Sequence, residues 1–216
     1  MLTVIQRNGE TSRIVISVTF SYVRQVMKTK EPLFNQLEAY PIIAAVRDEE
    51  GMAEALASPV KVIFLLNGTL SNIRARINQV KESGKMVFVH LEMMSGLSKD
   101  QAAVEFLHME MKPAGILTTK PNLIQKARSL GLITIQRLFM LDSLSIQTGI
   151  KMVNINQPDF IEIMPAIIPK VMVRVKKEST IPIIAGGMVE TKKEIIELLK
   201  VGVTAVSTSK AELWYL

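Results

Sequence analysis

Short apolar segments alternate with helical patterns along the chain from residue 41 onward. Residues 60–66 are apolar at both odd and even positions, which is typical of a strand buried on both faces of a parallel sheet. Between such segments, Ile73, Ile77 and Val80 recur at the spacing of one helix face. The pattern predicts eight strands, over residues 41–46, 60–66, 86–92, 114–119, 132–139, 160–165, 181–187 and 205–209.

This rhythm of strands and helices predicts the fold class. Ser98 with Gln101, and Thr191 with Glu194, have the spacing of capping boxes, which mark helix starts. Eight strands with seven intervening helices indicate an α/β protein with a closed (βα)8 TIM-type barrel, whereas the alternative, an open doubly wound sheet, usually has about five or six strands. Only about seven residues follow the last predicted strand, so we expect a truncated or missing eighth helix. Either residues 31–40 or another subunit should then cover that side of the barrel.

Residues 1–30 do not follow this rhythm, so we interpret them as an N-terminal extension to a single barrel domain over residues 31–216. Apolar residues alternate from Ile14 to Phe20 like a lone strand without an evident partner. Met27 begins a Met-Lys-Thr-Lys sequence that resembles a translation start. We therefore expect the extension to be disordered or to precede the natural start, and a genuine N-terminal arm is the alternative.

Composition narrows the functional class. The formal net charge is +6, but it is unevenly distributed. Residues 1–30 carry five Lys or Arg and one acid, whereas residues 31–216 carry 21 Lys or Arg and 19 Asp or Glu. A basic pI is therefore weak evidence for nucleic-acid binding by the barrel. The absence of cysteine excludes disulfides and thiolate metal sites and fits a reducing cytoplasm. The sequence has no apolar run of about 18 residues and no signal-peptide pattern, so we expect a cytoplasmic protein that does not contact the membrane.

The sequence lacks the motifs that mark several classes of enzyme. It contains no nucleophile elbow, no Walker loop and no histidine cluster of the metal-binding type. We therefore predict no bound metal, no cofactor and no catalytic residues.

The ends of the last two predicted strands carry the strongest signal for a ligand site. Functional groups of such barrels gather at the C-terminal ends of the strands, and the loops after strands seven and eight often bind phosphate. Strand seven ends in two glycines, whose backbone N–H groups can approach an anion closely. Strand eight ends in three hydroxyl residues followed by a short segment that could present a helix N-terminus. The predicted phosphate site is Gly186, Gly187, Ser207, Thr208 and Ser209, and the alternative is a tight turn beside a polar strand end.

Charged residues at the other strand ends could contact the same ligand. This predicted pocket set is Arg47, His90, Glu92, Lys120, Arg137 and Glu162. The cations could bind phosphate or form salt bridges with the two glutamates at the rim. The glutamates could accept hydrogen bonds from ligand hydroxyls, act as general acid and base, or bind Mg²⁺. The histidine lies within an apolar strand, where a packing role is more common.

A family resemblance rests on seven stretches of the sequence. They are 41–47 (PIIAAVR), 62–66 (VIFLL), 85–97 (KMVFVHLEMMSGL), 131–149 (GLITIQRLFMLDSLSIQTG), 160–170 (FIEIMPAIIPK), 182–187 (PIIAGG) and 205–214 (AVSTSKAELW). Across about residues 33–214 the chain resembles the glycerol-3-phosphate responsive antiterminators. Members of that family are bacterial cytoplasmic regulators. They respond to glycerol-3-phosphate and act on the leader of the glycerol operon transcript, so that polymerase reads through a terminator.

The resemblance implies that glycerol-3-phosphate is the ligand and that its phosphate binds at the ends of the last two strands. One departure concerns the pair after the third-strand histidine, which is usually Ile-Asp and is Leu91-Glu92 here. The carboxylate is kept but is one methylene longer, so the resemblance does not define the exact contact at this position. The extension over residues 1–30 is not a family feature, which supports a start near Met27.

The resemblance also implies leader mRNA as a partner, contacted by local cationic patches. The candidate residues are Arg74, Arg76, Lys81 and Lys85 on one predicted helix, Lys170, Arg174, Lys176 and Lys177 on a second, and Lys192, Lys193 and Lys200 on a third. The alternative for each group, and the more common case, is an ordinary solvated helix face. A homodimer would join the patches of two subunits, and phosphate neutralisation would make RNA binding depend steeply on salt.

Two other functions fit the same residues. A TIM-barrel enzyme (a lyase, isomerase or phosphodiesterase) acting on a small phosphorylated substrate would use His90, Glu92 and Glu162 as its acid–base set. Apart from Lys61, near the start of the segment 60–66, no lysine stands within a predicted strand to form a Schiff base, which disfavours part of this class. A small-molecule sensor that acts through a protein partner is the third alternative.

Overall fold

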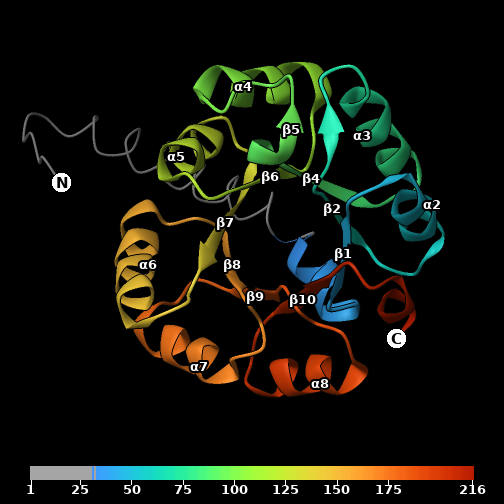
Figure 1. The fold of residues 1–216 in the computed structure, drawn as a ribbon. Coiled ribbons are helices and arrows are strands. Elements are labelled where there is room, and N and C mark those ends of the chain that lie inside the picture. The colour runs from blue at the N-terminus through green and yellow to red at the C-terminus, as the bar shows by residue number, and fades with distance from the viewer. Residues whose placement is uncertain (1–30, 32) are drawn as a thin grey trace, which may run out of the picture.

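The protein forms a closed parallel barrel surrounded by a ring of helices (Figure 1). The computed structural model describes residue 31 and residues 33–216, so the lone strand expected over residues 14–20 and the start expected at Met27 lie outside the described residues. The eight barrel strands follow the order β1-β10-β9-β8-β7-β6-β4-β2. The predicted TIM-type barrel is confirmed.

Every barrel strand lies within a segment that the hydrophobic pattern predicts. The barrel strands are β1 (Ile42–Val46), β2 (Val62–Leu65), β4 (Met86–His90), β6 (Gly115–Thr118), β7 (Ile133–Phe139), β8 (Phe160–Met164), β9 (Ile183–Gly186) and β10 (Ala205–Thr208). All four residues of β2 are buried, as its uninterrupted apolar sequence requires. A separate two-stranded sheet pairs β3 (Gly68–Thr69) with β5 (Met94–Ser95), after the C-terminal ends of β2 and β4.

Helices connect successive strands on the outside of the barrel. The α-helices are α2 (Glu49–Ala57), α3 (Ile73–Glu82), α4 (Gln101–Phe106), α5 (Pro121–Ser129), α6 (Ser143–Asn156), α7 (Pro169–Glu178) and α8 (Lys192–Lys200). The π-helix η2 (Leu107–Met111) continues α4, and the 3₁₀ helices are η1 (Leu91–Met93) and η3 (Ala211–Tyr215). Within the part of the chain that the structure describes, no helix is long and apolar enough to cross a membrane.

The two capping boxes expected from the sequence have different outcomes. Thr191 and Glu194 form the predicted box at the start of α8. The box predicted at Ser98 is wrong, because the N-cap of α4 is Asp100, whose carboxylate accepts a hydrogen bond from the backbone N–H of Ala103 at 3.0 Å. A carboxylate is a strong acceptor and complements the positive end of the helix, so it displaces the serine two residues earlier.

The eighth outer position holds only the short helix η3, which confirms the truncated eighth helix. Its residues Leu213 and Trp214 are buried against the barrel. The indole Nε1 of Trp214 donates to the carbonyl of Thr208 at 2.9 Å, and the hydroxyl of Tyr40 donates to the carbonyl of Trp214 at 2.6 Å. One large aromatic side chain therefore fills much of the space that a complete helix would cover.

The helical segment over residues 33–39 covers a different part of the barrel from the one we expected. Leu33 and Leu37 are almost fully buried and pack with Phe64 and Phe88 in the apolar cluster of the barrel interior. The ring of Phe34 lies 4.9 Å from that of Phe160, the first residue of β8. This segment therefore closes the N-terminal end of the barrel, and Tyr40, the residue after it, contacts η3 through the hydrogen bond to Trp214.

A polar layer lies between this interior apolar cluster and the C-terminal ends of the strands. Side chains alternate between the two faces of a strand, so residues two positions apart point the same way. Phe88, Ile135, Phe160 and Ala205 belong to the interior apolar cluster. The residues two positions later are His90, Arg137, Glu162 and Ser207, and all four are buried. Four strands thus direct polar groups into the barrel just below its mouth.

Candidate functional site

A cavity of about 260 Å³ opens at the C-terminal ends of the strands. It contains all but one of the residues predicted to bind phosphate, the exception being Gly186, and two of the predicted pocket cations. Its lining residues are Ala45, Arg47, Leu66, Arg137, Glu162, Met164, Gly187, Met188, Val189, Glu190, Ser207, Thr208, Ser209 and Lys210. The β8, β9 and β10 ends and the loops that follow them supply most of this wall.

A buried ion pair forms the floor of the cavity. Arg137 on β7 donates from Nε to Oε2 of Glu162 on β8 at 2.6 Å, and the two side chains are 7% and 1% exposed. The hydroxyl of Ser207 on β10 donates to the other carboxylate oxygen of Glu162 at 2.6 Å. Both oxygens of the glutamate are therefore satisfied, as a buried charge requires. Arg137 also lines the cavity, and its two remaining NH₂ groups can serve a ligand.

The two glycines at the end of β9 serve different purposes. A Cβ at Gly186 would lie 2.8 Å from Oε1 of Glu162 and would also collide with the hydroxyl of Ser207. Gly186 therefore makes room for the hydrogen bond between those two side chains. Gly187 has φ +79°, a left-handed conformation that favours glycine, and it lines the cavity. The backbone approach to an anion that we expected of both glycines is thus open only to Gly187.

The three hydroxyl residues at the end of β10 also differ in what they contact. The Thr208 hydroxyl donates to the carbonyl of Val189 at 2.9 Å and accepts from the backbone N–H of Lys210 at 3.1 Å, so it ties the β9 loop to the β10 loop. Ser209 and Lys210 are exposed at the cavity mouth. The following helix η3 is a five-residue 3₁₀ helix, so we assign no helix-dipole site to it.

Lys210 is a lining residue that the sequence reading did not single out. Its only signal in the sequence is its place directly after the hydroxyl residues of the last strand. With Arg47 and Arg137 it brings three cations to the cavity wall, against the carboxylates of Glu162 and Glu190. The wall therefore carries an excess of positive charge, which suits an anionic ligand.

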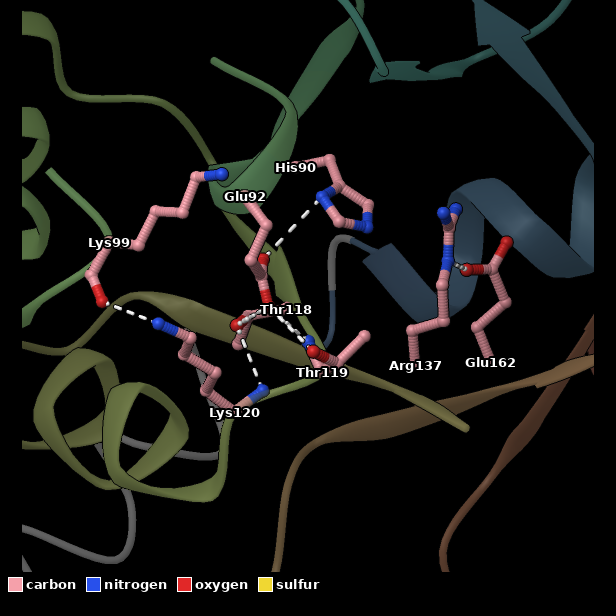
Figure 2. A network of polar contacts seen from close by, with 8 residues as sticks. All are labelled: His90, Glu92, Lys99, Thr118, Thr119, Lys120, Arg137 and Glu162. Atoms are coloured by element: carbon pink, nitrogen blue, oxygen red, sulfur yellow. Dashed lines mark hydrogen bonds and ion pairs between the residues drawn. The ribbon is translucent and has the colours of Figure 1, made fainter. Parts of the chain in front are cut away.

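Lys120 does not line the cavity. Its ammonium group donates to the backbone carbonyl of Lys99 at 2.9 Å, which fastens the start of α5 to the loop before α4 (Figure 2). Its backbone N–H is bound by the hydroxyl of Thr118 at 3.1 Å. The side chain therefore has a structural role in this arrangement, and we leave it out of the proposed ligand site.

His90 and Glu92 form a second polar cluster on the β4 side of the barrel (Figure 2). Oε1 of Glu92 accepts three hydrogen bonds, from the Thr118 hydroxyl at 2.8 Å and from the backbone N–H and hydroxyl of Thr119 at 2.7 and 2.8 Å. Burial raises the pKa of this carboxyl, but the three hydrogen bonds outweigh burial, so its pKa lies below the ordinary value. The cluster therefore holds a carboxylate that is fixed by the end of β6.

His90 is electrostatically linked to the cavity floor although it does not line the cavity. Burial, and after it the positive charge of Arg137, lower the pKa of its imidazole from 6.5 to about 4, against the opposing effect of Glu92 and Glu162. At neutral pH the ring is therefore uncharged. Among the described residues, no group of three or more His, Cys, Asp or Glu side chains is placed to hold a metal ion.

The structure separates the cationic candidates for RNA contact into two groups. Arg76 is 3% exposed and donates to the carbonyls of Asn67 and Asp48. Its guanidinium group therefore links the loops after β1 and β2 and does not face the solvent. The ammonium of Lys85 is bound by the carbonyls of Ala55 and Ser58. The expectation of a four-residue patch on one helix is therefore wrong for these two members, whose cationic groups already bind backbone carbonyls.

The remaining cations are exposed, except for the half-buried Arg174, and the lysines on α7 and α8 are the least paired. Arg74 pairs with Glu110 at 3.3 Å, and Arg174 pairs with Glu178 at 3.1 Å. Lys193 lies 4.0 Å from Glu197. Within the described residues no carboxylate lies within ion-pair distance of Lys81, Lys170, Lys176, Lys177, Lys192 or Lys200. Five of these six lysines lie on the neighbouring helices α7 and α8 (Figure 1).

Fold and site together define a TIM-barrel protein with a cation-rich cavity at the C-terminal end of its strands. The chain belongs to the glycerol-3-phosphate responsive antiterminator family, whose sequence pattern matches residues 42–214. This membership confirms the resemblance inferred from the sequence, and it indicates a regulator more than an enzyme.

Three proteins are similar to this chain over most of their length, and two of them are described as antiterminator proteins. An Escherichia coli (strain K12) protein described as uncharacterized protein YgcP is 34% identical over 185 residues, which span 86% of this chain and 97% of that protein. The crystal structure of a glycerol uptake operon antiterminator regulatory protein from Listeria monocytogenes has 34% identity and a TM-score of 0.79, over 81% of this chain and 95% of the other. A glycerol uptake operon antiterminator-related protein from Thermotoga maritima has 35% identity and a TM-score of 0.72, over 80% of this chain and 96% of the other.

Proposed function

We propose that this protein is a cytoplasmic transcription antiterminator that binds glycerol-3-phosphate in the cavity and then binds the leader mRNA of the glycerol uptake operon. The observation that carries the ligand assignment is the convergence of three cations with Gly187 and Ser209 around one cavity. A phosphate dianion would contact Arg47 and Lys210 at the mouth and the free guanidinium edge of Arg137 on the floor.

RNA contact is proposed for the face formed by α7 and α8. This lysine face carries Lys170, Lys176, Lys177, Lys192, Lys193 and Lys200, and all six side chains are exposed. The strands β8 and β9 connect directly to these helices and also end at the cavity. A ligand that binds better to the RNA-competent arrangement of these loops would shift the population toward it, whereas equal affinity for both states would shift nothing. Two copies of the chain in a homodimer would double the cationic area.

The ligand assignment is tested by isothermal titration calorimetry with glycerol-3-phosphate, with glycerol and inorganic phosphate as controls. We expect saturable binding of glycerol-3-phosphate, which is recovered unchanged afterwards. Each of Arg47→Ala and Lys210→Ala should weaken it about tenfold, because a hydrogen bond to a charged group contributes roughly 1.5–3 kcal/mol. Lys61→Ala, an exposed lysine before β2, is the matched control and should change nothing.

Two outcomes would contradict the assignment. Binding that survives both substitutions would place the phosphate elsewhere. Conversion of the ligand during the titration would favour a TIM-barrel enzyme that uses His90, Glu92 and Glu162 as its acid–base set, since the fold alone does not decide between regulator and enzyme.

A further inference from the structure

Two buried atoms on the β4 side of the barrel have no hydrogen-bond partner among the described residues, Nδ1 of His90 and Oε2 of Glu92. They lie 3.5 Å apart (Figure 2), and the side chain of His90 is only 5% exposed. Buried polar atoms are nearly always hydrogen-bonded, because leaving one unpaired costs free energy. A small movement of either side chain completes this pair, so the two residues are prepared to act as one unit.

The charge state of this pair selects the kind of group it can bind. Glu92 is a carboxylate fixed by three hydrogen bonds through its other oxygen, and the imidazole of His90 is neutral at neutral pH. A carboxylate beside a neutral ring repels a phosphate dianion. The pair therefore suits an uncharged hydroxyl group.

The position of the ring points its second nitrogen toward the cavity floor. His90 occupies the same interior layer as Arg137 and Glu162, two residues after Phe88 of the interior apolar cluster. In Figure 2, Nδ1 faces Glu92, and the other ring nitrogen lies on the side of Arg137 and Glu162. With the proton on Nδ1 and directed to the carboxylate, Nε2 presents a lone pair to the barrel interior.

We propose that His90, held in this tautomer by Glu92, accepts a hydrogen bond from a ligand hydroxyl and thereby reads the glycerol part of the ligand. The inference rests on the proposed function and deepens it, because it assigns the polyol and the phosphate to opposite walls of the barrel. The phosphate binds at the β9 and β10 loops, and the hydroxyl groups reach toward β4. His90 and Glu92 then determine specificity for a hydroxylated phosphate ester.

The test compares glycerol-3-phosphate with propyl phosphate, a phosphate ester of the same chain length that lacks both hydroxyls. The wild-type protein should prefer glycerol-3-phosphate by at least about tenfold, because propyl phosphate leaves the imidazole acceptor of His90 without a hydrogen-bond donor. His90→Phe and His90→Asn should remove this preference while leaving the affinity for propyl phosphate within about twofold. Glu92→Gln should reduce the preference by a smaller factor, since it releases the tautomer without removing the ring. His108→Phe, on η2, is the matched control and should keep the preference.

The outcomes separate this inference from the proposed function. If the wild-type protein binds glycerol-3-phosphate but does not discriminate against propyl phosphate, or if both His90 variants still discriminate, the inference is overturned and the proposed function stands. If the wild-type protein binds neither ester nor inorganic phosphate, the proposed function fails as well. If the affinity for both esters falls equally in the His90 variants, the ring supports the phosphate site or the fold, and the inference is also overturned.

The tautomer has its own readout, because the chain contains only two histidines. Nitrogen-15 NMR of histidine-labelled protein should show one ring, absent from the His90→Asn spectrum, with a protonated Nδ1 and an unprotonated Nε2 at pH 7. A charged ring at that pH, or a proton on Nε2, would contradict the proposed acceptor.

Discussion

Two glutamates of the barrel, the buried Glu162 on β8 and the half-buried Glu92 after β4, are held in different ways. Glu162 has a partner on each oxygen, an arginine on one and a serine on the other, and its charge is neutralised within hydrogen-bond distance. Glu92 concentrates three donors on one oxygen and leaves the other beside an uncharged histidine. The comparison teaches that protein groups fully pair the carboxylate of Glu162, whereas one oxygen of Glu92 faces the imidazole of His90 at 3.5 Å without a hydrogen bond among the described residues.

The largest effect is expected from Glu162→Gln, which leaves the charge of Arg137 buried without its counter-ion. The free energy of unfolding should fall by about 3 kcal/mol, measured by denaturant unfolding. The double variant Glu162→Gln/Arg137→Met should recover part of this loss, because it removes both charges. As a control, Glu178→Gln breaks an exposed ion pair and should cost less than about 0.5 kcal/mol. A loss as small as that control would show that the Glu162 pair is not a structural element.

A pH-dependent effect of similar size is expected from His90. Its pKa is lowered from 6.5 to about 4 in the folded protein, so protonation favours the unfolded chain. The contribution is fully present above pH 6.5 and is lost as the pH falls toward 4, by about 1.4 kcal/mol per pH unit in that window. Unfolding measured at several pH values should show this slope in the wild type and in His108→Gln, and a weaker one in His90→Asn. An unchanged slope in His90→Asn would mean that another group causes the acid sensitivity.

A smaller effect is expected from Thr118→Val, which removes one of the three donors to Glu92. The free energy of unfolding should fall by about 1 kcal/mol, and the pKa of the Glu92 carboxyl should rise toward its ordinary value. Thr148→Val, an exposed threonine on α6, is the matched control. Carbon-13 NMR of the labelled glutamate side chains measures the pKa directly, and a value that does not move would show that Thr119 alone fixes the carboxylate.

The sequence was sufficient to predict the barrel, the order of its elements and the ends of β9 and β10 as the cavity wall. These features depend on local patterns, namely apolar runs, helix periodicity and the position of Gly187 and Ser209 in the repeat. The short η3 was also predictable, from the few residues after the last strand. The role of residues 33–39 was not, because their apolar spacing does not say which end of the barrel they cover.

Long charged side chains account for most of the remaining differences between the predicted and the observed site residues. Lys120 reaches a backbone carbonyl of the loop before α4, and Arg76 reaches two loop carbonyls, although both residues occupy positions that suit an anion contact. These hydrogen-bond partners lie on loops that are distant in sequence, so the periodicity of the sequence does not predict them. His90 was more accessible to prediction, since alternation with Phe88 places it inside the barrel.

The central claim is that glycerol-3-phosphate in the cavity promotes RNA binding by the lysine face on α7 and α8. The most direct measurement is the affinity of the purified protein for the glycerol operon leader RNA, with and without glycerol-3-phosphate, at several salt concentrations. We predict tighter binding with the ligand, an affinity that falls steeply with salt, and a shallower salt dependence in Lys176→Glu/Lys177→Glu but not in Lys61→Glu. An RNA affinity that is the same with and without saturating glycerol-3-phosphate would contradict the account.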